Sequence, residues 1–322
     1  MYSVAQYTPT YYTQWNEFVA NSKNGTFLFH RDYMEYHSDR FTDFSLLVFE
    51  KNKLIAVLPA NRVGDVVYSH QGLTYGGLVY GFDTKQRDII AIYRELLLWL
   101  YTAGISKLHL KPVPAIYHKL PAQEQEYVFF LLNAVLEKRD GLSVIDYAMK
   151  IQPTKSRREA IKRGVKKNLK IVEEPDFKLF WTEILMPNLK KKHNVKPVHT
   201  IEEIEYLYSR FPDSIKHYNV YFEGKIVAGT TMYLTDTVAH PQYISGQEDK
   251  NALGSLDYLY NYLIDTYSAK NYFDFGPSTE SNGRKLNEGL VFWKETFGAR
   301  TIIQDFYSIA TDSYKLLDNV LI

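Results

Sequence analysis

The 322-residue chain contains no cysteine, which excludes disulfide bonds, thiolate nucleophiles and cysteine-based zinc sites. Its net charge is only +1, so the chain as a whole has no strong attraction to nucleic acid or to an anionic membrane. Any such binding needs a local patch. The longest apolar run, around residues 96–100, is far shorter than the roughly 20 residues that a membrane-spanning helix needs.

The first residues do not predict a secretory signal peptide. The first residues, MYSVAQYTPTYYTQWNEF, have neither a basic start nor an apolar core, and with the lack of cysteine this favours a cytoplasmic protein. What is present is a globular composition, with 45% hydrophobic and 23% charged residues. Tyrosine is frequent, at 27 residues. Tyrosine buries a ring and keeps a polar tip, which suits sheet cores and polar substrate sites alike.

The order of the expected elements repeats along the chain. Residues 48–72 and 221–247 each read as three strands joined by two turns. A long helical pattern and a strand ending in proline follow each set, at Pro112 and Pro277. Two helical segments precede each set, and a further helix and a closing strand, LSVIDYAMKI or TIIQDFYSIA, complete each unit. Because the whole order repeats, a duplicated mixed α/β unit is favoured over a chance likeness of two hairpins.

The predicted boundary between the two copies lies near residues 151–156, where QPTK interrupts the apolar alternation. We therefore predict an N-terminal domain over residues 1–152 and a C-terminal domain over residues 153–322. No low-complexity linker separates them, so we expect the two units to pack together. Such an interface is a usual place for a ligand site.

This order of elements resembles the GNAT (GCN5-related N-acyltransferase) superfamily, and two such units in one chain resemble the Fem-type (FemAB-like) aminoacyltransferases. The segments that carry the resemblance are SRREAIKRGVKKNLKIVEE, LTYGGLVYG, YFDFGPS and GLVFWKETFGAR. The resemblance covers nearly the whole chain. It implies an α/β fold (α+β mixed sheet) of two tandem GNAT-like units. It also implies transfer of an acyl or aminoacyl group from acyl-CoA or aminoacyl-tRNA to an amine, without a metal.

Two departures from the Fem pattern matter. Fem-type enzymes often carry a lysine after the second N-terminal helix, where this chain has His37. That difference puts a uridine-diphosphate-linked acceptor in doubt. The second unit also lacks the inserted helical hairpin that forms a coiled-coil arm in some members of the family.

Residues 155–170 form a dense basic run, with eight lysines and arginines against one acid, Glu159. At helical spacing, Arg158, Lys162 and Lys166 share one face. This face fits a phosphate-rich donor such as a charged tRNA, or a nucleotide-linked acceptor. A solvated helix face explains the same pattern, and the residues alone leave the two interpretations about even. No aromatic residues interleave with the run, so base stacking is not supported.

The segment QEDKNALGSLDYL, residues 247–259, lies where GNAT enzymes that use acyl-CoA hold the pyrophosphate. Here it offers only Gly254, with Ser255 as the expected helix cap, and the acids Glu248 and Asp249 repel phosphate. A capped helix start is therefore favoured over a pyrophosphate cradle. In the first unit, Tyr75 lies in the corresponding glycine-rich LTYGGLVYG and is a further candidate for substrate binding.

A polar loop and a strand in the second unit supply further candidates. His193 and His199 lie in KKKHNVKPVHT, and His199 is a candidate base or a contact for a substrate carboxylate, although a plain polar loop is slightly favoured. In the strand HPQYISG, Tyr243 is a candidate hydrogen-bond donor or proton carrier, and a buried structural tyrosine is equally consistent. Alternation places Gln242 on the opposite face of that strand from Tyr243. The histidines show no metal-site spacing.

The passage YFDFGPSTESNGRKLNEGLVFWKETFGA carries the strongest candidates. Asp274 lies near the end of a strand, where open α/β sheets place their ligands, and Lys294 follows on an amphipathic helix. As a cation, Lys294 fits the stabilisation of an oxyanion or a phosphate, and the resemblance points to it as substrate-binding. A surface lysine paired with a glutamate explains it equally well without the resemblance. We expect Asp274 and Lys294 to line an open cleft.

The residues and the resemblance together predict an acyltransferase that acts on an amine, with a cell-wall or amino-sugar precursor as a candidate acceptor. The predicted catalytic residues are Lys294, Asp274, Tyr243 and His199. The predicted substrate-binding residues are Arg158, Lys162, His193, Gln242, Gly254, Ser255, Gly276, Asn287, Tyr75 and His37. Two alternatives stay open: an acetyl-CoA-dependent N-acetyltransferase of a small amine, and a non-catalytic GNAT-like protein that binds a ligand.

Overall fold

The computed structural model describes residues 2–322, apart from the side chains of Lys192 and His193. The chain forms two compact units. Unit 1 holds the residues up to Asp140 together with Ile303–Ile322, and unit 2 holds Gly141–Ile302. The division therefore falls after residue 140, not after residue 152 as the sequence pattern predicts, and the end of the chain returns to the first unit.

The two closing strands explain this difference. Strand β8 (Val135–Asp146) begins in unit 1 and pairs in unit 2 with β13 (Tyr272–Pro277). Strand β16 (Arg300–Ala310) begins in unit 2 and pairs in unit 1 with β7 (Lys107–Leu110). With 12 and 11 residues these strands are each long enough, at about 3.3 Å per residue, to run through both units. The expectation that each closing strand completes its own unit is wrong.

Unit 1 contains two sheets with helices packed on them. Its helices and turns are η1 (Pro9–Tyr11), α1 (Tyr12–Ala20), η2 (Phe27–Phe29), α2 (Arg31–Glu35), α3 (Gln86–Thr102), η3 (Ala115–Tyr117), α4 (Glu124–Leu131) and η6 (Thr311–Leu317). Its remaining strands are β1 (Tyr2–Gln6), β2 (Leu46–Glu50), β3 (Lys53–Leu58), β4 (Asn61–Val63), β5 (Val66–Tyr68) and β6 (Val79–Tyr80). One sheet has the order β1-β2-β3-β6, and the hairpin β4–β5 joins β7 and β16 in the other. The expected three-stranded meander is therefore split between two sheets.

Helix α3 forms the centre of the unit 1 core. Its buried residues Ile89, Ile92, Tyr93, Leu96 and Leu100 recur at helical spacing and form one apolar face. That face packs in a cluster with strand residues of unit 1. The first turn of the helix is capped because the side chain of Asp88 accepts a hydrogen bond from the backbone N–H of Lys85 at 2.9 Å. A hydrophobic helix on a sheet is the packing that the amphipathic sequence pattern predicts.

Unit 2 is built on a sheet with the strand order β8-β13-β12-β11-β10-β9. Its other strands are β9 (Lys170–Glu173), β10 (Ile215–Phe222), β11 (Lys225–Leu234), β12 (Val238–Gly246), β14 (Thr279–Glu280) and β15 (Lys285–Leu286). Its helices and turns are η4 (Tyr147–Met149), α5 (Lys155–Lys166), α6 (Phe177–Phe180), the π-helical turn η5 (Trp181–Leu185), α7 (Met186–His193), α8 (Ile201–Arg210), α9 (Lys250–Leu253), α10 (Ser255–Thr266) and α11 (Glu288–Glu295). The meander β10–β11–β12 is the one that the sequence predicts.

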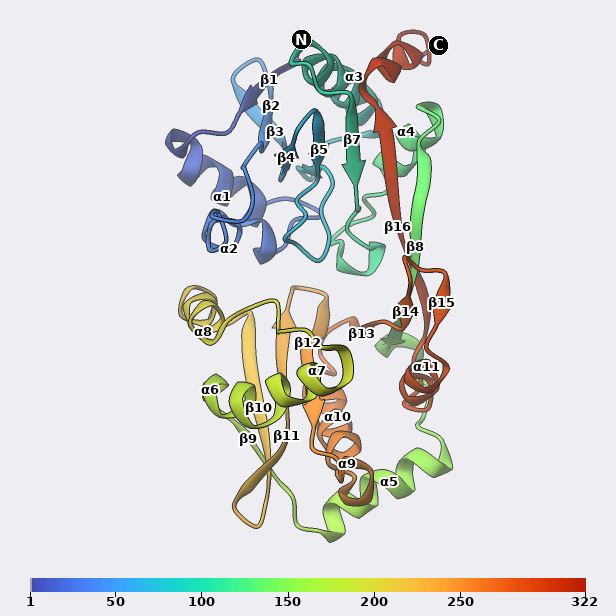
Figure 1. Cartoon of the computed structure of the whole chain (residues 1–322). Coiled ribbons are helices and arrows are strands. Elements are labelled where there is room, and N and C mark those ends of the chain that lie inside the picture. The colour runs from blue at the N-terminus through green and yellow to red at the C-terminus, as the bar shows by residue number, and fades with distance from the viewer. Residues whose placement is uncertain (1) are drawn as a thin grey trace. The chain divides into compact units, whose positions relative to one another are not determined.

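The two faces of this sheet carry different side chains. On one face Tyr260 of α10 packs with Phe273 and Phe275 of β13 in the main apolar core of unit 2. On the other face Trp181 packs against Tyr243 of β12, and His217 of β10 packs against the same helical segment. Figure 1 shows α7 and α10 beside these strands. The alternation of a β-strand therefore separates an apolar face from a face that contains polar and ring-bearing residues.

Within residues 2–322, no helix is long and apolar enough to cross a membrane.

Candidate functional site

Strands β12 and β13 of unit 2 separate soon after they meet. They pair in parallel at Val238 with Tyr272 and at Ala239 with Phe273, and the described residues contain no further pair between them. Each strand nevertheless continues on its other side. The ladder of β12 with β11 reaches Gly246, and β13 pairs with β8 as far as Pro277. The backbone edges beyond the last pair are thus released from each other, at the carboxyl end of β13, where sheets of this kind place ligands.

A bulge in β12 lies next to this point. In the ladder with β11, Tyr243 pairs with Thr231 and Pro241 pairs with Met232, so Gln242 is the extra residue. Gln242 is half-buried. Bulges change the direction of neighbouring side chains, and this bulge lies just beyond Ala239, where the pairing of β12 with β13 ends.

His240 and Asp274 are the first residues beyond the last β12–β13 pair, and their groups meet. The Nδ1 atom of His240 lies 2.9 Å from the backbone oxygen of Asp274 and 3.5 Å from its Oδ2 atom. The side chain of His240 is 14% exposed, whereas that of Asp274 is 3% exposed. The carboxylate also accepts a hydrogen bond from the backbone N–H of Gly276 at 2.7 Å. A buried acid thus holds an imidazole that reaches the surface.

Lys294 of α11 is buried behind this pair, with 2% of its surface exposed. Its ammonium donates to the backbone oxygens of Gly276 at 2.9 Å and Pro277 at 2.7 Å. Burial lowers the pKa of Lys294 from 10.5 to about 8, and the charge of Asp274 opposes part of that shift. The expectation that Asp274 and Lys294 line an open cleft is wrong, because both are about 2% exposed. Lys294 instead fixes the last two residues of β13.

The conformation at the end of β13 depends on Gly276. Its φ is +73°, and a Cβ atom added there would lie 3.2 Å from Cε1 of His240. The imidazole therefore rests on a position without a side chain. Downstream, Asn287 caps α11: its Oδ1 accepts from the backbone N–H of Leu290 at 3.0 Å, and its Nδ2 donates to Glu280 at 2.9 Å. Asn287 is exposed and orients the helix that carries Lys294.

His199 and Tyr243, both predicted as catalytic, are brought together on the other face of the sheet. The hydroxyl of Tyr243 lies 2.5 Å from Nδ1 of His199 and accepts a hydrogen bond from its backbone N–H at 3.1 Å. The indole N–H of Trp181 donates to the backbone oxygen of His199 at 3.1 Å. The next residue, Thr200, begins α8 with a capping box to Glu203. These contacts fix the loop, and both side chains are less than 10% exposed.

The start of α10 is closed by α5. Gly254 and Ser255 are buried, and a Cβ atom added to Gly254 would lie 2.4 Å from the backbone oxygen of Ala160. Gly254, not Ser255 as predicted, is the cap residue of the helix. Asp257 in the first turn forms an ion pair with Arg157 of α5 and accepts a hydrogen bond from Trp293 at 2.9 Å. A helix start that is covered and carries a carboxylate is poorly suited to a phosphate group.

The outer face of α5 is exposed and basic. Its inward side is formed by Arg157, Ala160 and Gly164. Arg158 and Lys162 lie on the exposed side, where Arg158 donates to the backbone oxygen of Pro153 at 2.5 Å and Lys162 pairs with Glu159 at 2.9 Å. The remaining exposed basic residues of this helix and its end are Lys155, Arg163, Lys166, Lys167 and Lys170.

The predicted residues of unit 1 are buried. His37 is 1% exposed, stacks on Tyr36 with ring centroids 4.2 Å apart, and lies 5.1 Å from the ring of His70. Burial lowers the pKa of His37 to about 4 and that of His70 to about 3. Tyr75 is 3% exposed and donates to the hydroxyl of Thr26 at 3.2 Å. These positions form part of the packing of unit 1.

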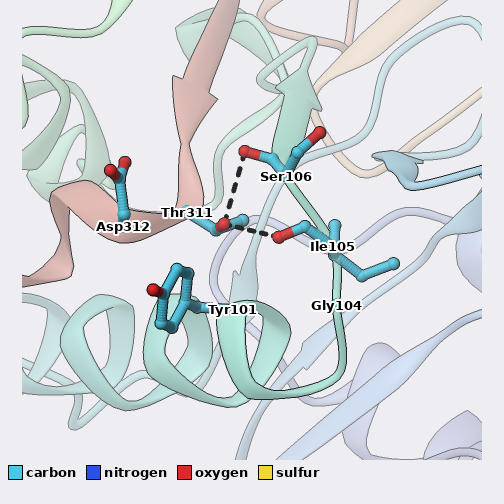
Figure 2. Close-up of a pocket in the computed structure, with 6 residues that line it drawn as sticks. All are labelled: Tyr101, Gly104, Ile105, Ser106, Thr311 and Asp312. Atoms are coloured by element: carbon cyan, nitrogen blue, oxygen red, sulfur yellow. Dashed lines mark hydrogen bonds between the residues drawn. The ribbon is translucent and has the colours of Figure 1, made fainter.

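Two hollows of about 350 Å³ each lie in unit 1, away from any predicted site residue. Figure 2 shows the first, with Tyr101 of α3 and Asp312 of the C-terminal turn among the residues that line it. There Thr311 donates to the backbone oxygens of Ile105 at 2.5 Å and Ser106 at 3.3 Å, which attaches the end of the chain to unit 1. The second is lined by residues of α1, β1, β3 and the start of α3. We assign no chemistry to either.

In the described part of the chain, no group of three or more His, Asp or Glu side chains is arranged to hold a metal ion. The side chain of His193, a predicted substrate-binding residue, lies outside the described residues. The sequence reasoning did not select His240. Its partner Asp274 lies 34 residues away, and the only available signal was the position of His240 on the third strand of the meander.

No family model and no curated protein matches this sequence. Solved structures do match. FemX has a TM-score of 0.67 with 10% identity, over 98% of this chain and 99% of that one. L-PGS from Bacillus licheniformis has a TM-score of 0.55 with 13% identity, over 85% and 87%. A tandem GNAT protein from the clavulanic acid biosynthesis pathway has a TM-score of 0.50 with 11% identity, over 97% and 99%. The predicted tandem GNAT/Fem-like fold is confirmed.

Proposed function

From this tandem GNAT/Fem-like fold, we propose that the chain is an acyltransferase that moves an acyl or aminoacyl group from an activated ester or thioester to an amine. The observation that carries the proposal is the separation of β12 and β13 in unit 2. Beyond the last pair the two strands no longer bond to each other's N–H and C=O groups, and on β13 the oxygens of Gly276 and Pro277 bond to Lys294 instead. An acyl donor that lies along the edge of β12 can form hydrogen bonds with backbone groups that β13 no longer pairs. The likeness in fold to FemX and L-PGS supports the same reaction class.

The proposed mechanism is direct transfer without a covalent enzyme intermediate. The amine nitrogen attacks the acyl carbon, and the ester or thioester bond to the carrier breaks. Backbone N–H groups of the released edge stabilise the oxyanion. Lys294 acts as a positioning residue, because it holds the oxygens of Gly276 and Pro277 and so fixes the turn beside that edge. Tyr243 and His199 maintain the β12 bulge from the other face.

For the donor we propose an aminoacyl-tRNA. The start of α10 is buried under α5 and carries Asp257, which disfavours a CoA pyrophosphate there. The exposed face of α5 offers basic residues, including Arg158 and Lys162, that suit a phosphate backbone. This helix has no aromatic residue on its exposed face, so it would follow phosphates without stacking on bases. The amine acceptor follows the resemblance, as a cell-wall or amino-sugar precursor.

The experiment is a single-turnover assay with two donors, a pool of tRNA charged with ¹⁴C-labelled amino acids and ¹⁴C-acetyl-CoA. The acceptors are lysine, glucosamine and a lysine-containing pentapeptide. We expect a labelled amide from the charged tRNA pool. If a labelled amide forms only from acetyl-CoA, the donor is an acyl-CoA and the proposal of aminoacyl-tRNA is wrong. Consumption of neither donor would contradict the proposal and favour a ligand-binding protein.

The donor surface is tested separately by charge reversal. Arg158→Glu with Lys162→Glu should weaken tRNA binding at 100 mM salt by at least tenfold. It should also reduce the slope of log Kd against log salt by about 1 per lost phosphate contact. The matched control is Lys53→Glu with Lys107→Glu, two exposed lysines of unit 1. If both double variants lose the same affinity for tRNA, the effect comes from the net charge of the chain and not from the face of α5.

A further inference from the structure

We propose that His240 is the residue that takes the proton from the attacking amine and returns it to the leaving group. This inference rests on the proposed acyl transfer and adds a residue that the sequence pattern did not select. It is argued from the position of His240 at the separation of β12 and β13, from its contact with Asp274 and from its partial exposure.

The contact with Asp274 determines the tautomer of the imidazole. A backbone carbonyl oxygen only accepts hydrogen bonds, so the Nδ1 atom 2.9 Å away must carry the hydrogen. The neutral ring then has its lone pair on Nε2. With Nδ1 held, Nε2 is the atom available to an incoming proton.

The surroundings of His240 suit a group that gains charge during a reaction. From β13, the carboxylate of Asp274 lies 3.5 Å from Nδ1 and stabilises an imidazolium. From α11, the ammonium of Lys294 donates to the backbone oxygen of Gly276, the residue next to the imidazole, and its positive charge opposes an imidazolium. From β11, Tyr233 pairs with His240 across the ladder. A buried acid, a buried ammonium and a partly exposed imidazole are therefore held in one network of hydrogen bonds.

The step balances without another reactant. The amine nitrogen forms a bond to the acyl carbon as one of its N–H bonds breaks, and the proton goes to Nε2 of His240. The bond between the acyl carbon and the carrier oxygen then breaks with its electron pair on oxygen. Nε2 returns the proton to that oxygen, which restores the neutral ring. For a thioester donor, sulfur takes the place of oxygen.

A purely structural role must be distinguished from this one. The ring of His240 terminates the β12–β13 ladder, because its Nδ1–H bonds to a backbone oxygen at the position where the ladder stops. A residue that only separates the strands needs this hydrogen bond and nothing from Nε2. His240→Asn keeps an N–H donor close to the position of Nδ1 and removes Nε2. His240→Gln places an amide near Nε2 instead and serves as a second variant if the first does not fold.

The first measurement is ¹⁵N NMR of the imidazole groups in the full chain, with the His240 signal assigned by comparison with His240→Asn. We expect the neutral ring of His240 to be the Nδ1–H tautomer. The Nε2–H tautomer would overturn the proposal, since the lone pair would then face Asp274. This measurement needs no substrate, so it stands apart from the proposed function.

The second measurement is the single-turnover rate with the charged tRNA pool and the pentapeptide. His240→Asn should lower the rate by about 100-fold or more, with an unchanged Kd for the tRNA pool. The dependence of the rate on pH should also differ between the wild type and His240→Asn. His109→Asn, a strand histidine of unit 1, is the control and should leave both unchanged. Equal rates in wild type and His240→Asn would overturn this inference alone. No transfer by the wild type from either donor would overturn the proposed function as well.

Discussion

Each unit contains a pair of parallel strands at the same point of the repeat, and the two pairs end differently. In unit 1, β5 and β7 pair at three successive positions, and Gly76 then forms a further bridge to Pro112. The backbone N–H of Ser69 donates to the backbone oxygen of His109 at 2.8 Å, and that of Gly76 donates to the backbone oxygen of Lys111 at 2.7 Å. In unit 2 the pairing of β12 and β13 stops after two positions. In unit 1 backbone hydrogen bonds continue between the two strands, whereas in unit 2 the two strands separate.

A lysine with a lowered pKa lies at the end of each parallel pair of strands, which we call the junction of its unit. Lys111 in unit 1 donates to the backbone oxygen of Leu73, and Lys294 in unit 2 donates to those of Gly276 and Pro277. Burial lowers the pKa of each lysine from 10.5 to about 8. The lysines thus perform the same structural task. What distinguishes unit 2 is His240 with Asp274 at an unpaired strand edge, which is why we assign the proposed chemistry to that unit.

The largest predicted effect separates the two lysines. Lys294→Met should reduce kcat for transfer by about 100-fold with little change in the donor KM, because the turn beside the reacting edge loses its anchor. Lys111→Met should leave both constants unchanged. Both variants should lose a similar amount of stability, about 1–3 kcal/mol, because carbonyl oxygens lose a donor. Urea unfolding and steady-state kinetics check this, and equal kinetic losses would remove the distinction between the units.

The stability of both junctions should depend on pH in the alkaline range. Each folded lysine has a pKa of about 8, below the unfolded value of 10.5, so the unfolded chain binds more protons between these values. The contribution of each lysine to the free energy of unfolding is therefore fully present above pH 10.5 and is lost as the pH falls through 8. Relative to Lys294→Met, the wild type should gain on the order of 2 kcal/mol between pH 8 and 10.5. Parallel curves for the two proteins would contradict the lowered pKa.

A pair of glycines tests whether the site in unit 2 depends on its turn. Gly276 has φ of +73° and Gly64 in unit 1 has φ of +61°, so Gly→Ala at either position should cost about 1–2 kcal/mol. A Cβ atom at Gly276 would lie 3.2 Å from Cε1 of His240, whereas a Cβ atom at Gly64 would have no atom within 4 Å. Only Gly276→Ala should change the ¹⁵N signals of His240 and slow transfer. A similar change from Gly64→Ala would mean that general backbone strain is the cause.

The smallest predicted effect concerns two buried tyrosines. Tyr243→Phe removes the hydroxyl that contacts His199 at two atoms, and should cost about 1–2 kcal/mol of stability and several-fold in kcat. Tyr75→Phe in unit 1 removes a 3.2 Å hydrogen bond to Thr26 and should cost about 1 kcal/mol with no change in kcat. Thermal unfolding with kinetics compares them. A loss of transfer in Tyr75→Phe would point to a role for unit 1.

The sequence pattern predicts the repeated order of elements, because that order follows from local alternation and helical spacing. The tandem GNAT/Fem-like fold is what the resemblance to that family implies. It does not predict the partners of β8 and β16, since alternation identifies a strand but not its neighbour. It identifies the passage that contains Asp274 and Lys294 but not their burial. A lysine on an amphipathic helix is normally at the surface, and the carbonyl groups of the last two residues of β13 explain why this one is not.

The most direct test of the account is hydrogen exchange of the full chain, measured by mass spectrometry with and without the charged tRNA pool. Residues 240–246 of unit 2 should become protected when the donor is bound, because the edge of β12 beyond its last pair with β13 gains hydrogen-bond partners. Residues 66–76 and 107–112 of unit 1, which their own backbone already closes, should not change. Protection confined to the unit 1 junction, or no protection at the edge of β12 while tRNA is bound, would contradict the assignment of the site to unit 2.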